Sequence, residues 1–186
     1  MSYSLTAKKL RLPLGFVLAA FYLWYTPNAM TTGLTVVVGA VIALVGLLIR
    51  AWASGHIMKN DRLATTGPYA HTRNPLYFGS FLLGAGFAVA SDFRLLLLVI
   101  AFWVLVYGPT MQRERANISS RFPEAYADYQ SNVPAFVPRP TPWRQDRTGG
   151  DTPFSLALYM KHGEWKAALG FAGVLAWILV RMALQR

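Results

Sequence analysis

The chain has 186 residues, the length of one domain, and 54% of them are hydrophobic while only 14% are charged. Soluble domains carry about a quarter charged residues, so this composition, with a mean hydropathy of +0.34, indicates an integral membrane protein. The apolar content and the lack of cysteine exclude a disordered chain, a disulfide-built secreted scaffold and Cys-ligated metal.

Five apolar blocks predict five membrane-spanning helices, each near the minimum length that crosses a hydrocarbon core. The first block follows Lys8, Lys9 and Arg11 and could be read as a signal peptide. Residues 26–33 lack a small-residue cleavage pattern, however, so we expect a span that is not removed. In chain order the blocks cover about residues 10–25, 34–53, 75–90, 93–109 and 165–184.

The third and fourth blocks must form an antiparallel hairpin, because little more than Ser91 and Asp92 separates them. We therefore predict an all-α polytopic membrane protein with about five transmembrane helices. We expect residues 1–186 to form a single domain, with a last span over about residues 165–184.

The cationic residues are concentrated in loops 55–74 and 111–164 and avoid loop 26–33. The positive-inside rule therefore places both cationic loops and the N-terminus in the cytoplasm and the C-terminus outside, although Arg181 and Arg186 argue weakly against the last step. The hairpin starts at one cationic loop and ends at the other. Both loops should meet on one membrane face, and there we expect the chemistry.

The first polar segment, residues 63–80, turns at Gly67 and opens a helix at Pro75, because proline suits a first helical turn and excludes helical backbone before it. A helix N-terminus presents free amide donors to a carboxylate or phosphate. In a simpler interpretation, Arg73 contacts lipid headgroups, and Tyr69 and Tyr77 belong to the interfacial aromatic belt. The polar residues crowded there are Tyr69, His71, Arg73, Asn74 and Tyr77.

The second polar segment, residues 112–139, begins with Glu114 just beyond the fourth block. Aromatic residues at helical spacing follow, which predicts an amphipathic helix lying on the membrane surface. Residues 133–152, rich in proline and polar residues, predict an irregular crossing segment. The spaced aromatics are Phe122, Tyr126 and Tyr129.

Together the two segments resemble the isoprenylcysteine carboxyl methyltransferase and phospholipid methyltransferase superfamily of membrane enzymes. The family pattern is a Gly-Pro-Tyr turn, Arg-His-Pro-x-Tyr-x-Gly opening a helix, a hairpin, Glu-Glu, an aromatic helix and a Val-Pro-x-Phe-x-Pro exit. The resemblance covers the core motif region, residues 55–139. It rests on Gly67-Pro68-Tyr69, Arg73-Asn74-Pro75-Leu76-Tyr77-Phe78-Gly79, Glu114-Arg115, Phe122 with Tyr126 and Tyr129, and Val133-Pro134-Ala135-Phe136-Val137-Pro138.

The resemblance implies S-adenosylmethionine bound at the cytoplasmic face and a lipophilic acceptor that enters from the bilayer. Glu114 would pair with the cofactor's ammonium group, and Arg73 would orient an acceptor carboxylate, which its planar fork fits. Gly79 would let the cofactor approach the helix. The implied catalytic residues are Arg73 and Glu114, and the implied cofactor-binding residues are Tyr69, His71, Asn74, Pro75, Tyr77, Gly79 and Glu114.

Two departures from the family pattern affect these expectations. Asn74 stands where the family has histidine, which removes a titratable group, and Arg115 replaces the second glutamate. The best acceptor is an isoprenylcysteine-like carboxylate and the runner-up a phospholipid amine. The alternatives from other classes are a sterol reductase that uses reduced nicotinamide cofactor and a non-catalytic membrane protein.

The remaining polar residues receive structural interpretations. The histidines have no metal-like spacing, so no metal site is expected. Arg50 at a span end is interpreted as an interface anchor and Glu164 as a headgroup contact. The expected partners are a lipophilic small molecule and membrane lipids, with no nucleic acid and no obligatory protein partner, because the cations are scattered over block ends.

Overall fold

The computed structural model describes residues 2–26, 31–57, 62–144 and 153–184, and every regular element in those ranges is helical. Parts of the predicted loops 26–33 and 55–74 and of the predicted crossing segment 133–152 lie outside the described residues. The elements are α1 (Ser2–Tyr25), α2 (Gly33–Ser54), the 3-10 turn η2 (Gly67–Ala70), α3 (Pro75–Ser91), α4 (Leu95–Phe102), the π turn η3 (Trp103–Tyr107), α5 (Gly108–Arg121), α6 (Pro123–Asn132), α7 (Leu156–His162) and α8 (Trp165–Leu184).

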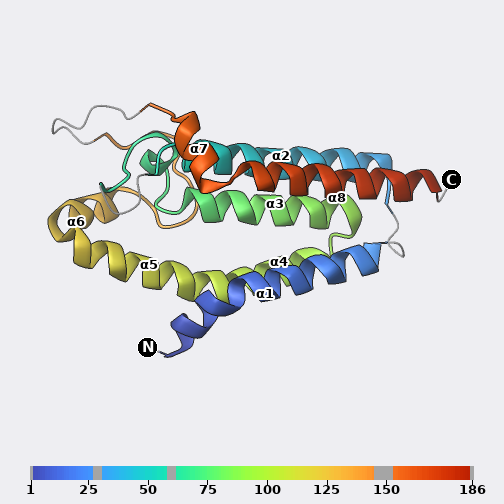
Figure 1. Cartoon of the computed structure of the whole chain (residues 1–186), viewed down its shortest axis with the longest axis horizontal. Coiled ribbons are helices and arrows are strands. Elements are labelled where there is room, and N and C mark those ends of the chain that lie inside the picture. Colours follow the sequence, from blue (N-terminus) through green and yellow to red (C-terminus); the bar gives the residue numbers. More distant parts are fainter. Residues whose placement is uncertain (1, 27–30, 58–61, 145–152, 185–186) are drawn as a thin grey trace.

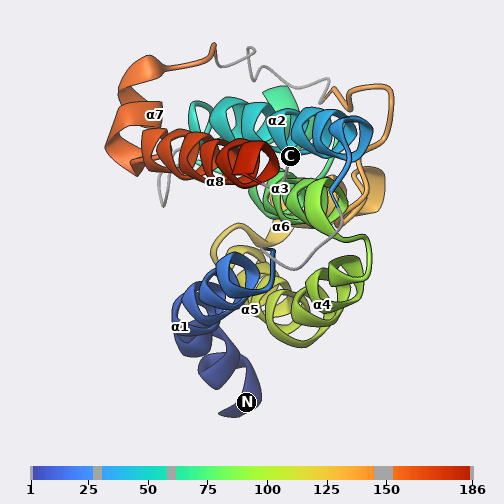
Figure 2. The same cartoon turned by 90° about the vertical axis from the view of Figure 1, so that its right-hand side faces the viewer.

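The long helices lie roughly along one axis, and the polar segments gather at one end of it (Figure 1). Seen end-on, α2, α3 and α8 form one group, and α1 lies with α4 and α5 in a second (Figure 2). The described parts of both predicted cationic loops lie at the end that carries η2, α6 and α7, while the C-terminus lies at the other end. The hairpin therefore brings the two polar segments together, as the sequence predicts.

Among the residues that the structure describes, three helices are long and apolar enough to cross a membrane. They are α2, the continuous helix Leu95–Arg121 formed by α4, η3 and α5, and α8. The predicted second and fifth spans are thereby confirmed in length and composition. α3 is apolar but has 17 residues, and α1 does not meet the same criteria, so the predicted number of five spans stays a prediction.

The helix that begins at the site, α3, packs tightly on α2. This is the most extensive helix contact in the described residues. A Cβ added at Gly86 would lie 2.4 Å from the backbone N of Ala43, and one added at Gly46 would lie 2.5 Å from the carbonyl O of Gly79. Glycines spaced seven apart on each helix therefore let the two backbones touch. This contact fixes α3, whose N-terminus begins at the site.

The fourth predicted block is longer than expected. The sequence suggests an end at Pro109, but the helix continues to Arg121 and carries Glu114 with it. Proline lacks the N–H of a regular helical bond and its ring crowds the preceding turn, and the backbone widens into the π turn η3 just before Pro109.

The predicted aromatic helix exists as α6, but its aromatic face is covered by the protein itself. Tyr126 and Tyr129 are only 3% and 2% exposed and cluster with Val133. The partly buried residues packed on this cluster include Leu63 and Trp143. The position of α6 on a membrane surface stays a prediction.

Two polar residues have other partners than the sequence suggests. Arg50 forms a bidentate ion pair with Glu164, with N–O distances of 2.7 and 2.8 Å, and also donates to Ser80. The half-buried guanidinium links α2 to the segment before α8. The interpretations of Arg50 as an anchor and of Glu164 as a headgroup contact are therefore wrong, because each satisfies the other inside the molecule.

Candidate functional site

The predicted crossing segment pairs with the turn before α3, which carries Arg73 and Asn74. The backbone N–H of Arg73 donates to the carbonyl of Pro134 at 2.9 Å, and the N–H of Arg139 donates to the carbonyl of His71 at 2.9 Å. Side chains reinforce this pairing, since Thr72 Oγ1 donates to the carbonyl of Phe136 at 2.9 Å. The Val-Pro-x-Phe stretch is thus held against the Arg-Asn-Pro stretch by backbone bonds.

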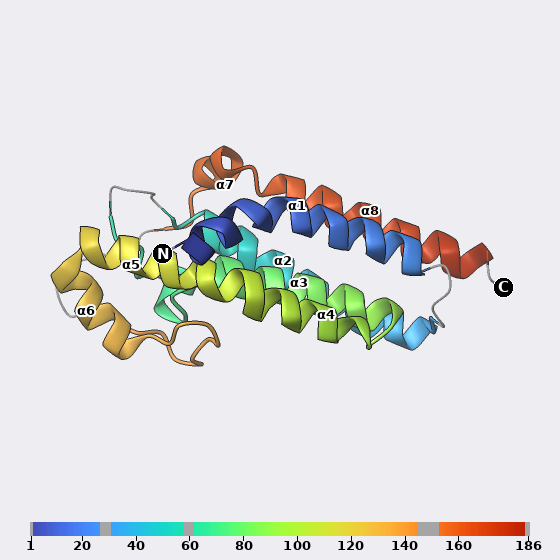
Figure 3. The ribbon, with the colours of Figure 1, turned by 90° about the horizontal axis from the view of Figure 1, so that it is seen from below.

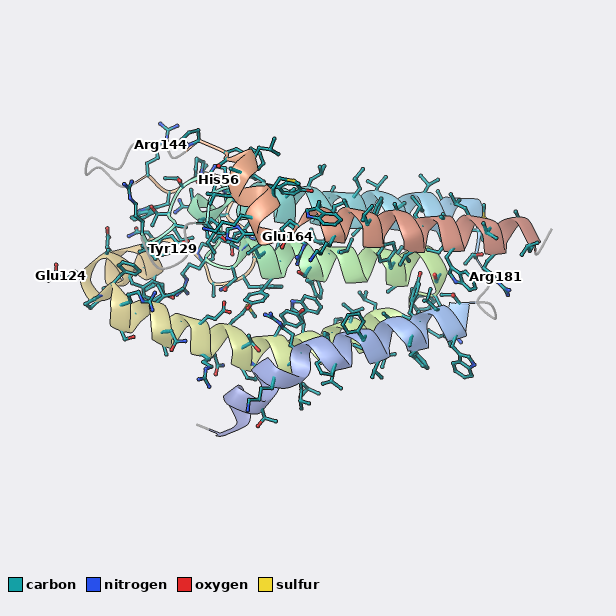
Figure 4. All side chains as sticks on the ribbon, in the orientation of Figure 1. His56, Glu124, Tyr129, Arg144, Glu164 and Arg181 are labelled. Carbon is teal, nitrogen blue, oxygen red and sulfur yellow. The ribbon has the colours of Figure 1, made fainter. Side chains whose placement is uncertain are left out.

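A cavity of about 410 Å³ lies between η2, α5 and α6. Its charged lining consists of four arginines and one glutamate, and its wall is completed by apolar and aromatic side chains. Figure 4 shows Tyr129, from that wall, at the polar end of the molecule with His56 and Arg144, while Arg181 lies at the opposite end. The lining residues that enter the argument are Arg62, Tyr69, Arg73, Asn74, Glu114, Arg115, Arg121, Tyr126 and Tyr129.

Two residues of the cavity wall carry a hydrogen-bond donor that has no partner in the part of the chain that the structure describes. Tyr69 is 6% exposed, and neither its hydroxyl nor Nε of Arg73 has a hydrogen-bond partner among the described residues. Burial raises the pKa of the Tyr69 hydroxyl above its ordinary value, so it stays protonated. Buried donors without partners are costly, so this wall is suited to a ligand oxygen.

Arg73 and Tyr69 are held by the aromatic cluster of α6. Arg73 Nη1 donates to the hydroxyl oxygen of Tyr126 at 3.2 Å, and the Tyr129 hydroxyl donates to the carbonyl of Tyr69 at 2.7 Å. Burial also raises the pKa of Tyr129, which keeps it a donor. The α6 tyrosines therefore orient the donors of the cavity.

Glu114 faces the cavity from α5 and is held from behind by α3. The hydroxyl of Tyr77 donates to Glu114 Oε1 at 2.8 Å and accepts from Arg11 Nη1 at 3.0 Å. Tyr77 also packs edge-on against Tyr107 of the π turn, with ring centroids 5.2 Å apart. The bond from Tyr77 to Glu114 is thus one of several hydrogen bonds that join the two motif segments.

The other predicted site residues differ in whether they line the cavity. Asn74 lines it while its side-chain amide donates to the carbonyl of Ala135 at 2.7 Å. His71 is not part of the lining; its Nδ1 lies 2.8 Å from the carbonyl of Arg139. Pro75 is fully buried at the start of α3.

Gly79 lies against α2, where an added Cβ would be 2.6 Å from the carbonyl O of Gly46. The close approach that Gly79 permits is therefore to a neighbouring helix, and contact of Gly79 with a cofactor stays a prediction. His71 likewise has a structural contact, and its contact with the cofactor stays a prediction.

Sequence reasoning missed Arg11, which reaches the site from the first apolar block, and the lining residues Arg62 and Arg121. Arg11 stands at the start of the first apolar block beside Lys8 and Lys9, so the local sequence does not distinguish it from an interface cation. In the part of the chain that the structure describes, no group of three or more His, Cys, Asp or Glu could hold a metal ion.

Parts of this chain are similar in sequence to known proteins. The sequence model of the phospholipid methyltransferase family matches residues 29–125, just over half of the chain. The chain is 36% identical over 129 residues to the cobalt-zinc-cadmium resistance protein CzcN of Cupriavidus metallidurans. It is 34% identical over 129 residues to the nickel-cobalt-cadmium resistance protein NccN of Alcaligenes xylosoxydans xylosoxydans.

Each of these two matches covers 67% of this chain and 56% or 57% of the relative, so the chain spans just over half the length of those proteins. A shorter match of 30% identity over 82 residues joins it to the protein-S-isoprenylcysteine O-methyltransferase of Schizosaccharomyces pombe. That match covers 43% of this chain and 34% of the yeast protein. No solved structure matches the chain.

Proposed function

This chain belongs to the phospholipid methyltransferase family, and on that premise we propose that it transfers the methyl group of S-adenosylmethionine to a small lipophilic acceptor in a membrane. One observation carries the proposal: Arg73 and Glu114, from segments on either side of the hairpin, line the same cavity. The volume of that cavity is in the range of small-molecule sites.

The residues of the cavity suit this cofactor. S-adenosylmethionine supplies a sulfonium-bound methyl group that needs no further activation. Glu114, held by Tyr77, would pair with the amino group of its methionine part, since an oriented carboxylate is the natural partner of an ammonium. The neighbouring Tyr69, Asn74 and Tyr126 would line the remainder of the cofactor.

The acceptor that this site fits best is a carboxylate of isoprenylcysteine type. Nε of Arg73 and the Tyr69 hydroxyl are buried donors that lack a protein partner among the described residues, and a carboxylate offers two acceptor oxygens. An ionised carboxylate is already a nucleophile, so no proton has to be removed from it. The replacement of the family histidine by Asn74, which cannot act as a base, is compatible with such an acceptor.

The contribution of the protein would then be alignment and exclusion of water. Holding two reacting groups in line can contribute several kcal/mol, about 7 or more in the best cases. Arg73 is fixed by Tyr126 and by the backbone bond to Pro134, so its donors are held in one direction. The aromatic wall of α6 keeps that end of the cavity apolar.

We also propose that α1 and α3 cross the bilayer with the three longer helices, giving five spans with the cavity on the cytoplasmic side. The 17 residues of α3 would span about 25 Å, close to the thickness of the hydrocarbon core. The excess of arginine and lysine in the loops at the cavity end supports the cytoplasmic side.

Radiolabel transfer from S-adenosylmethionine to a panel of lipid extracts and prenylcysteine analogues tests the proposal. We expect a labelled methyl ester, which base hydrolysis releases as volatile methanol. Arg73→Gln should raise the KM for the acceptor at least about tenfold, because a bond to a charged group is lost, and leave binding of S-adenosylhomocysteine unchanged.

Arg144→Gln is a matched control, because Arg144 is an exposed arginine outside the cavity lining. If Arg73→Gln weakens binding of S-adenosylhomocysteine and leaves the acceptor KM alone, Arg73 holds the carboxylate of the cofactor instead. Protein that retains reduced nicotinamide dinucleotide and binds no S-adenosylhomocysteine would contradict the methyltransferase proposal.

The runner-up acceptor is a phospholipid amine, and the name of the family favours it. The arginines of the lining would then hold the lipid phosphate, as guanidinium groups commonly do. Base-stable label in the ethanolamine headgroup, with none in volatile methanol, would decide for this acceptor and against the carboxylate.

A further inference from the structure

Arg11 on α1 contacts the site from outside both motif segments. Its Nη1 donates to the Tyr77 hydroxyl oxygen at 3.0 Å, and that hydroxyl donates to Glu114 Oε1 at 2.8 Å. The same guanidinium lies 5.9 Å from the ring centroids of both Tyr77 and Tyr107, within cation–π range. α1 packs along α5 and the π turn, so its N-terminal part lies beside the helix that carries Glu114 (Figure 3).

The direction of these bonds follows from the chemistry of the groups. An ionised glutamate only accepts, so the single proton of the Tyr77 hydroxyl must go to Glu114. The hydroxyl oxygen is then free to accept from Arg11, whose guanidinium can only donate. A hydroxyl that accepts from a cation becomes a better donor, so the two bonds strengthen each other. Arg11 thereby favours the one orientation of Tyr77 that holds Glu114.

The surroundings of Arg11 differ from those of an interface anchor. Lys9, two residues earlier on the same helix, is exposed, whereas Arg11 is half-buried. A guanidinium withdrawn from water needs compensating partners, and here these are the Tyr77 hydroxyl and two aromatic rings. α1 also precedes residues 29–125, so the family pattern does not include this contact.

We propose that Arg11 is a positioning residue for Glu114 that acts through Tyr77, and that α1 is therefore part of the cofactor site. The inference rests on the proposed function, because it assigns Arg11 a task only if Glu114 binds the cofactor. Arg11 touches neither the acceptor nor the cofactor in this account. It sets the affinity of the site by fixing the carboxylate.

A mutant cycle measured by calorimetry with S-adenosylhomocysteine tests the proposal on the whole 186-residue chain in detergent. Arg11→Met should weaken binding about tenfold, the low end for a bond that involves a charged group. Arg11→Lys keeps a cationic donor and should stay within about threefold of the wild type. In a Tyr77→Phe background both Arg11 substitutions should have no further effect, because the group through which Arg11 acts is gone.

Lys9→Met is the matched control, because it removes an exposed cation of the same helix, and it should bind as the wild type does. The positioning role would be overturned if the losses of affinity from the two single substitutions add in the double variant. Unchanged binding by Arg11→Met would also overturn it, and either result would leave the proposed function intact. Should Arg11→Met fail to fold, the cycle of Arg11→Lys with Tyr77→Phe still decides: the small loss must vanish in the phenylalanine background. Wild-type protein that binds no S-adenosylhomocysteine would overturn both proposals.

Discussion

Tyr69 and Tyr129 are both buried tyrosines on the cavity wall, but only the Tyr129 hydroxyl has a hydrogen-bond partner among the described residues. Tyr69→Phe should leave the thermal midpoint unchanged or raise it, because it removes an unsatisfied buried hydroxyl. It should also raise the KM for the acceptor. Tyr129→Phe should instead cost about 1–2 kcal/mol of stability, since the carbonyl of Tyr69 loses its donor.

Thermal unfolding of the two variants in the same detergent, with transfer kinetics on each, checks this contrast. Equal destabilisation by the two substitutions would indicate that the Tyr69 hydroxyl has a partner in the free protein. In that case it would not be available to a ligand.

At the residue scale, Tyr69, Arg73, Asn74 and Glu114 line one cavity, because the hairpin brings the two segments that carry them together. Their roles in binding and catalysis stay predictions. The sequence does not reveal Arg11. That contact depends on the rotation of α1 against α5, which is decided by the packing of many weak apolar contacts and leaves little trace in local sequence.

Among the elements, α2 and α3 depend on glycine at their contact. A Cβ at Gly86 would lie 2.4 and 2.5 Å from backbone atoms of Ala43 and Gly39, which cannot move aside as a side chain can. Gly86→Ala should therefore destabilise the protein by about 1–3 kcal/mol. Gly84→Ala is the matched control on the same helix: its Cβ would lie 3.5 Å from Val99, an ordinary contact, and it should be neutral or slightly stabilising.

Thermal unfolding in detergent compares the two alanine variants. A Gly86→Ala protein as stable as Gly84→Ala would mean that α2 and α3 do not touch as described. The seven-residue spacing of Gly39 with Gly46 and of Gly79 with Gly86 could have predicted this contact from sequence. The expectation for Gly79 instead followed the family motif, and the motif does not distinguish the face of α3 that meets α2.

The turn between α3 and α4 contains a pH-dependent contact. Asp92 accepts from the Tyr25 hydroxyl at 2.7 Å and from the backbone N–H of Arg94 at 2.9 Å. The Tyr25 bond, with the Arg94 bond second, holds the pKa of Asp92 below its ordinary value. A lowered pKa in the folded state means that the contribution to stability is present above the unfolded-state pKa of about 4 and is lost as the pH falls through the folded-state value.

Asp92→Asn should therefore be less stable than the wild type at pH 7, and the difference should shrink as the pH is lowered below about 4. Tyr25→Phe is the companion variant and should show the same trend, because it removes the larger cause of the shift. A stability difference that stays constant from pH 7 to pH 3 would show that the ionised form of Asp92 is not what holds the turn.

For the whole molecule, the account requires the cavity end to face the cytoplasm. The chain has no cysteine, so single cysteines report the side of the membrane without background. Phe93→Cys lies in the exposed turn after α3, and Glu124→Cys lies on the exposed side of α6 at the cavity end. An impermeant maleimide applied to intact cells should label the first and not the second, and the opposite result would invert the topology.

The helical fold and the meeting of the two polar segments follow from the sequence, because apolar block length and a two-residue turn leave few other arrangements. The pairing of residues 134–143 with the turn before α3, by contrast, uses backbone bonds that no side-chain pattern specifies. The π turn before Pro109 and the ion pair of Arg50 with Glu164 also depend on tertiary packing.

The central claim is that the carboxylate of Glu114, just beyond the hairpin, binds S-adenosylmethionine. Calorimetry of S-adenosylhomocysteine with wild type, Glu114→Gln and the exposed control Glu124→Gln tests it most directly. We predict saturable binding to the wild type and the control, and affinity lower by about tenfold or more for Glu114→Gln, because a charge-assisted bond is lost. Equal affinity for all three proteins, or no binding by the wild type, would contradict the account.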